Sequence, residues 1–271
     1  MKLPSAIISD ADGTLVDTVS LIRHGQFETI KNYLANIGLS TETIPTYEFF
    51  EQVLHDTIGG SAHETLKRTV TALYSTSPTI IEKIDFDKLH ELLNPTQDVL
   101  APNYVKAYEG LTELFEVTSK LHVKFAIFTS GTSHHVVRNF GIALPELGLS
   151  KLYEDKAMSD SEKLAMFCEK LQTYFKLPAF TIVTCEDVTA HKPDPESLLL
   201  GLNRLNANVS DCLVFGDHEV DIQAGLRAGI VQRVGVTHGF SNADSLLTAG
   251  ATETVTSLPE FTAKLNSASK T

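Results

Sequence analysis

A short apolar run near the start of the chain leads directly into closely spaced acidic residues. Residues 6–8 are Ala-Ile-Ile, and residues 9–14 are Ser-Asp-Ala-Asp-Gly-Thr. The run predicts a buried strand, and residues two apart on a strand point the same way, so Asp10 and Asp12 are expected to share a face. Neighbouring carboxylates disfavour each other's ionisation, a cost that is typical of a functional site. The alternative is a turn in which Asp12 and Thr14 bond only to local backbone.

A second apolar run, residues 125–128, ends in Thr129-Ser130-Gly131-Thr132. The hydroxyls, together with the backbone N–H groups of a following helix start, are suited to binding an anion. The alternative is that the serine and threonine side chains only cap that helix.

A third apolar run, residues 212–216, closes in Gly-Asp, with a further acid four residues on. Asp217 and Asp221 can then face one point, and carboxylate oxygens are the ligands that Mg²⁺ prefers. Alternatively, Asp217 caps the next helix and Asp221 interacts favourably with the helix dipole. Both interpretations can hold together.

Lys192 precedes two prolines, Pro193 and Pro195, in the segment His-Lys-Pro-Asp-Pro-Glu. Proline at the first helical positions fixes how the chain enters a helix. Lys192 is therefore expected in a conformationally restricted turn before the helix, where it would be the fixed positive charge of a site.

The apolar runs predict the fold class. They lie at 6–9, 125–129, 180–184, 212–216 and 230–236, separated by helical patterns. This alternation is typical of an α/β protein with a doubly wound, mostly parallel sheet and helices on both faces. Because ligands bind at the carboxyl ends of such strands, the polar segments above are expected at one edge of the sheet.

The strand signal disappears between residues 17 and 99, where apolar residues recur at helical spacing. We therefore predict a core domain of residues 1–16 and 100–271 and an inserted helical domain of about four helices. The expected hinges are the turn after Thr14 and the stretch 101–103.

The four polar segments follow one another along the chain from Asp10, Thr129, His191 and Asp217. In this order they resemble the haloacid dehalogenase-like hydrolase superfamily, in the phosphatase branch that includes phosphoglycolate phosphatase and β-phosphoglucomutase. The resemblance covers most of the chain and implies a Rossmann-like core with an inserted helical cap that closes over the site. It implies catalytic roles for four residues, Asp10, Asp12, Thr129 and Lys192, and a metal site of Asp10, Asp12, Asp217 and Asp221. It also implies a specificity loop that contains Gly59 and Gly60. Together with Ser130 and Gly131 of the Thr129 segment, these two glycines are the expected phosphate- or substrate-binding residues.

Within this resemblance, Asp10 is the nucleophile, Asp12 is the general acid and base, and the backbone carbonyl of Asp12 also binds the metal. The implied function is a Mg²⁺-dependent phosphatase that hydrolyses a small soluble phosphomonoester, such as a sugar phosphate or phosphoglycolate, through an aspartyl phosphate. Three alternatives stay open: a phosphomutase, a haloacid dehalogenase that needs no metal, and a catalytically silent binding module.

The formal net charge of −12 disfavours nucleic-acid and anionic-membrane partners, which need clustered Lys and Arg. The first apolar stretch is too short for a signal peptide or a membrane span, so a cytoplasmic location is expected. Cys168, Cys185 and Cys212 match neither a disulfide framework nor a zinc spacing. The expected partner is a small phosphorylated metabolite, and the protein is expected to be a monomer or a homodimer.

Two features depart from the family pattern. His218 stands where a small hydroxyl residue is common, and the connection 144–176 is longer than usual. An exposed apolar stripe on the helix of that connection would favour a dimer, and a buried one would not. His134 and His135, at the helix start after the Thr129 segment, are expected on the surface, and the alternative is that they reach the site from that helix start.

Overall fold

The computed structural model describes residues 1–39, 43–58 and 61–270. The chain forms two compact units. One joins Met1–Thr18 to Val105–Thr271, and the other is the intervening segment Val19–Tyr104. The sequence predicts 17–99 for this intervening domain.

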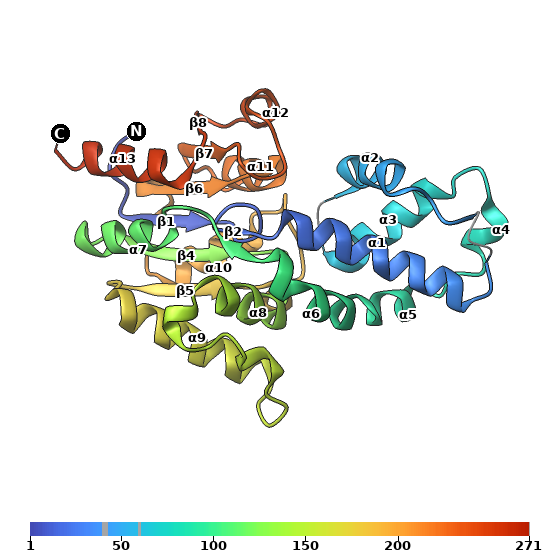
Figure 1. The fold of residues 1–271 in the computed structure, drawn as a ribbon. Coiled ribbons are helices and arrows are strands. Elements are labelled where there is room, and N and C mark those ends of the chain that lie inside the picture. The colour runs from blue at the N-terminus through green and yellow to red at the C-terminus, as the bar shows by residue number, and fades with distance from the viewer. Residues whose placement is uncertain (40–42, 59–60, 271) are drawn as a thin grey trace. The chain divides into compact units, whose positions relative to one another are not determined.

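A six-stranded sheet forms the centre of the first unit (Figure 1). Its strands lie in the order β5-β4-β1-β6-β7-β8, and every neighbouring pair is parallel. Their bounds are β1 Ala6–Ser9, β4 Lys124–Phe128, β5 Phe180–Val183, β6 Cys212–Gly216, β7 Gln232–Val236 and β8 Glu253–Val255. The first five fall on the predicted apolar runs, which confirms the predicted α/β fold class with a parallel sheet.

Seven α-helices accompany the sheet in the described part of this unit. They are α7 Leu111–Lys120, α8 Ser133–Ala143, α9 Asp160–Phe175, α10 Glu196–Arg204, α11 Glu219–Arg227, α12 Ala243–Thr248 and α13 Leu258–Ala268. Side chains alternate along each strand, so both faces need cover. Ile8 and Val214 pack in a buried cluster with Ala224 of α11. The next side chain, Phe215, points to the opposite face and stacks on Phe261 of α13, with ring centroids 4.1 Å apart.

Two short strands, β2 (Val16–Asp17) and β3 (Lys106–Ala107), form an antiparallel ribbon in which Asp17 pairs with Lys106. The chain therefore leaves the first unit and returns to it at adjacent strands. The expected hinge at 101–103 is wrong, because these residues lie inside a helix that ends only at Tyr104 and buries Ala101 completely.

The second unit is helical throughout its described residues. Its helices are α1 Val19–Asn36, α2 Tyr47–Thr57, α3 Ala62–Leu73, α4 Pro78–Ile81, α5 Phe86–Glu91 and α6 Leu93–Tyr104. The prediction of four helices is wrong in number for the described residues, because the segment from Ile81 to Leu93, with its apolar residues at helical spacing, is divided among three helices. Asp85 starts α5 by accepting a hydrogen bond from the Lys88 N–H at 3.1 Å. None of the described helices is both long and apolar enough to cross a membrane.

The long connection 144–176 contains α9, which carries the apolar stripe that bears on dimerisation. Phe167, Leu171 and Phe175 of this stripe are buried within the first unit, and Phe175 packs against Phe115 of α7 with ring centroids 5.0 Å apart. The stripe therefore serves the core and gives no argument for a dimer.

Candidate active site

Three of the predicted functional residues follow the carboxyl ends of neighbouring strands, β4, β1 and β6 (Figure 1). Asp10 follows β1, Thr129 follows β4 and Asp217 follows β6. Because β1 lies between β4 and β6, these side chains meet at one edge of the sheet. The Asp10 N–H continues the β1–β6 ladder by donating to the Phe215 carbonyl at 2.8 Å.

Lys192 lies between two carboxylates at this edge. Its Nζ contacts Asp10 Oδ1 and donates to Asp221 Oδ1 at 2.7 Å. The same Nζ lies 4.2 Å from the centroid of the Phe128 ring, a cation–π contact. The Lys192 side chain is only 4 % exposed. Its charge is therefore buried within the site, unlike that of a solvated surface lysine.

Thr14 links two of the acids. Its Oγ1 lies 2.6 Å from Asp217 Oδ1 and 3.2 Å from Asp10 Oδ2. One hydroxyl has one proton, so it donates to the nearer oxygen, on Asp217. A protonated Asp10 can in turn donate to the Thr14 oxygen. In the sequence, Thr14 is expected at most to bond to local backbone, and nothing there indicates this bridge.

The backbone approaches Asp217 closely at two glycines. Gly13 has a φ of +85°, and a Cβ there would lie 2.5 Å from Asp217 Oδ2. A Cβ at Gly239, after β7, would lie 2.0 Å from the same oxygen. The Phe240 N–H donates to it at 2.8 Å. Only glycine allows this approach, and the loop after β7 contributes to the site although no motif of the sequence analysis includes it.

Burial is the largest single influence on the pKa of Asp10, Asp217 and Lys192 in the cluster. Burial, together with the neighbouring Asp221 and Asp12 charges, raises the pKa of Asp10 to about 7, even though Lys192 acts to lower it. Burial and then the charges of Asp10 and Asp221 raise the pKa of Asp217 well above its ordinary value. Burial alone would lower the pKa of Lys192, but the two carboxylates outweigh it and raise that pKa. One cation thus does not neutralise the acids.

The donor set fits a hard divalent cation. Asp10, Asp217 and Asp221 each offer a carboxylate oxygen, and these oxygens all lie within 4.8 Å of one another. Mg²⁺ takes oxygen ligands and is held by few protein carboxylates, and its charge would relieve the repulsion described above. The Asp12 side chain does not belong to this group, and the predicted metal role of its backbone carbonyl stays a prediction.

Asp12 lies beside the cluster, next to the segment after β4. Its Oδ1 accepts a hydrogen bond from Nδ2 of Asn139, on α8, at 2.9 Å. Its Oδ2 faces Gly131, where a Cβ would lie 3.5 Å away. Asn139 is not among the site residues predicted from the sequence. The signal is a polar pair, Arg138-Asn139, inside the otherwise apolar run from Val136 to Phe140.

The segment after β4 is held from two sides. Thr129 Oγ1 accepts from the Gly131 N–H at 2.9 Å, and the Gly131 carbonyl accepts from the Cys185 N–H at 3.1 Å. The Ser133 N–H and hydroxyl both donate to Glu186 Oε2, at 2.7 and 2.6 Å. Thr129, Ser130 and Gly131 thus lie in a fixed loop beside Asp12. The predicted substrate residues Gly59 and Gly60 lie outside the described residues.

Three histidines near the loops take structural positions. His218 begins α11, where its Nδ1 accepts from the Val220 N–H at 3.3 Å. The expectation that His134 and His135 lie on the surface is wrong. His135 is 7 % exposed, because its ring accepts from the Thr132 N–H at 3.2 Å and thereby starts α8.

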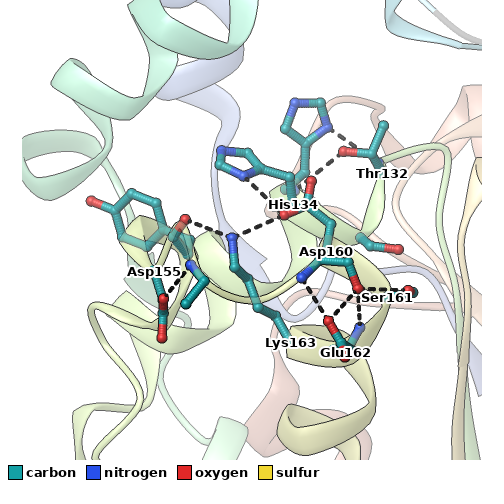
Figure 2. A network of polar contacts seen from close by, with 12 residues as sticks. Thr132, His134, Asp155, Asp160, Ser161, Glu162 and Lys163 are labelled. Carbon is teal, nitrogen blue, oxygen red and sulfur yellow. Dashed lines mark hydrogen bonds and ion pairs between the residues drawn. The ribbon is translucent and has the colours of Figure 1, made fainter.

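His134 joins a polar network with the start of α9 (Figure 2). Its Nδ1 lies 3.9 Å from Asp160 Oδ1, and Lys163 Nζ donates to that oxygen at 3.1 Å. Lys163 also donates to the Tyr153 carbonyl at 3.3 Å. This network ties α9 to the helix that follows the Thr129 loop.

The acid cluster makes the stability of the metal-free protein depend on pH. Asp10 has a folded-state pKa of about 7, above its ordinary value of 3.8. Its contribution is therefore fully present below pH 3.8 and lost as the pH rises through 7. We expect the unfolding free energy in EDTA to fall between pH 5 and pH 8, measured by urea denaturation. Mg²⁺ should restore more stability at pH 8 than at pH 5.

Asp217→Asn is the matching variant, because the amide can accept from the Phe240 N–H and donate to Thr14 Oγ1. With one acid fewer, its stability in EDTA should depend less on pH, and Mg²⁺ should stabilise it less than the wild type. A wild-type unfolding free energy that is flat between pH 5 and 8 would contradict the prediction.

Comparison with known proteins agrees with the geometry. The family model of the haloacid dehalogenase-like hydrolases matches residues 4–229. The pyrophosphatase PpaX of Bacillus velezensis is 26 % identical over 245 residues, covering 90 % of this chain and 88 % of that protein.

Two solved structures share the fold. A hydrolase from Pseudomonas syringae has a TM-score of 0.65 at 24 % identity, covering 97 % of this chain and 98 % of that one. A predicted phosphoglycolate phosphatase from Haemophilus somnus has a TM-score of 0.68 at 17 % identity, covering 98 % and 99 %. The family match over residues 4–229 confirms the resemblance found in the sequence and the prediction of an enzyme. The chain belongs to the haloacid dehalogenase-like hydrolase family.

Proposed function

We propose that this protein is a Mg²⁺-dependent phosphatase that hydrolyses a small phosphomonoester through a phosphorylated Asp10. The observation that carries the proposal is the buried Lys192 between Asp10 and Asp221, with a third acid in the same cluster. Asp10, Asp217 and Asp221 would hold the ion, and when bound it supplies positive charge that offsets the acids and an incoming phosphate.

In the first half-reaction, the Asp10 carboxylate attacks phosphorus while the bond to the leaving oxygen breaks. Lys192 stabilises negative charge on the phosphoryl oxygens, and its burial strengthens that effect. Thr129 and the N–H groups of the loop after β4 orient the phosphate. Asp12 protonates the leaving alkoxide and becomes a carboxylate.

In the second half-reaction, water attacks the phosphorus of the aspartyl phosphate. The Asp12 carboxylate takes a proton from this water as the new P–O bond forms, and the bond between Asp10 and phosphorus breaks. Asp12 is thereby protonated again. One acid serves both steps, in opposite directions.

A second candidate substrate is inorganic pyrophosphate, because the PpaX relative covers 90 % of this chain. The same residues can cleave a phosphoanhydride, in which the leaving group is phosphate. Its departure depends less on protonation than that of an alkoxide. The family resemblance also implies that the helical second unit selects the substrate, and this stays a prediction.

A phosphate-release screen tests the proposal. The panel holds sugar phosphates, phosphoglycolate, p-nitrophenyl phosphate and pyrophosphate, each with Mg²⁺ and with EDTA. We expect Mg²⁺-dependent release from at least one phosphomonoester. Release from pyrophosphate alone would favour the second candidate, and no release from any compound would overturn both. Activity that requires an added sugar bisphosphate would instead favour the phosphomutase alternative.

A further inference from the structure

The side chain of Asn139 has one possible orientation. Its Oδ1 accepts from Arg138 Nε at 2.9 Å, and its Nδ2 donates to Asp12 Oδ1 at 2.9 Å. A guanidinium can only donate, so the amide oxygen must face Arg138 and the NH₂ group must face Asp12. The contact therefore does not depend on the usual ambiguity between amide oxygen and nitrogen.

This orientation makes the two oxygens of Asp12 unequal. Oδ1 already faces an N–H donor, so a proton on Oδ1 would meet another proton-bearing group. Oδ2 has no hydrogen bond from the residues that the structure describes, and it faces Gly131 of the loop after β4. Protonation on Oδ2 leaves Oδ1 as the carbonyl oxygen, the better acceptor for the Asn139 N–H, so a protonated Asp12 favours the proton on Oδ2.

We infer that Asn139 is a positioning residue that fixes Asp12 so that Oδ2 alone gives and takes the proton. The inference rests on the proposed function and extends it to a residue of α8. In the first step the Oδ2–H bond breaks and its proton moves to the leaving oxygen, whose bond to phosphorus also breaks while Asp10 bonds to phosphorus. In the second step Oδ2 takes a proton from water as the bond between Asp10 and phosphorus breaks.

A leaving-group comparison tests this role. Alkyl phosphates need the acid because an alkoxide is a poor leaving group, whereas p-nitrophenolate departs without protonation. In both cases kcat/KM reports the steps up to phosphorylation of Asp10. We expect Asn139→Ala to lower kcat/KM for an alkyl phosphate roughly tenfold or more beyond its effect on p-nitrophenyl phosphate, part of the usual contribution of a general acid.

The ratio of the two kcat/KM values does not depend on how much of the variant folds, because unfolded protein lowers both equally. Asn139→Asp is the second variant: it is nearly isosteric but cannot donate to a carboxylate, and the same selective loss is expected. Ser133→Ala, on the same helix, loses the hydroxyl hydrogen bond to Glu186 but keeps the one from its backbone N–H, and it should lower both values in equal proportion.

Equal losses on the two substrates in both Asn139 variants would overturn the inference and leave the phosphatase proposal intact. A wild-type protein that cleaves neither substrate, nor any other phosphomonoester, would overturn the proposed function itself. The two failures are therefore distinguishable.

Discussion

Asp10→Asn is expected to abolish phosphate release while the protein stays folded. The amide has almost the shape of the carboxylate but is not a nucleophile, so turnover should fall by roughly 10⁴-fold or more. The Asn Oδ1 can still accept from Lys192, and Asp221 still balances the lysine charge. Phosphate release under saturating Mg²⁺ measures the loss, and circular dichroism confirms the fold.

Asp17→Asn is the matched control for this variant. Asp17 lies on β2 and pairs with Lys106 at 3.9 Å, outside the acid cluster. The same chemical change there should leave turnover within about twofold, since exposed ion pairs contribute little. Turnover of Asp10→Asn that stays close to that of Asp17→Asn would contradict the nucleophile assignment.

The sequence predicts the sheet and the acid cluster because strong local signals encode both. Buried parallel strands need continuous apolar runs, and Asp10 and Asp217 each follow such a run directly. Strand β8 escapes prediction because Glu-Thr-Val is too short and too polar to stand out. The strands β2 and β3 escape because each has only two residues.

Contacts made by ordinary residues are harder to predict than motifs. Thr14 reads as a turn residue, and only the fold brings its hydroxyl to Asp217 across 203 positions of sequence. Asn139 bonds to Asp12 across 127 positions. Such pairs depend on how α8 and the turn after β1 meet in three dimensions, which neither periodicity nor spacing encodes.

Lys192→Met is expected to cost both activity and stability. The lysine and its two partner side chains are 4 %, 9 % and 2 % exposed. Removing one partner of a buried ion pair leaves uncompensated charge, which destabilises proteins by about 3–5 kcal/mol. We expect a loss of this size in EDTA at pH 8, from urea denaturation, and a loss of phosphate release in Mg²⁺.

The loss should shrink at pH 5, because the acids can then take up protons. Lys192 acts to lower the pKa of Asp10, so without this cation that pKa rises further above its ordinary value. The stabilising contribution of protonated Asp10 is fully present below pH 3.8 and is lost only as the pH rises through the raised pKa, so more of it is retained at pH 5 than at pH 8. Lys163→Met is the matched control: that lysine is also buried, but its partner Asp160 is 44 % exposed and stays hydrated. Its loss should be smaller and nearly equal at pH 5 and 8. An equal pH response in the two variants would show that burial of the methylene chain, and not the neutralised acids, accounts for the stability that Lys192 contributes.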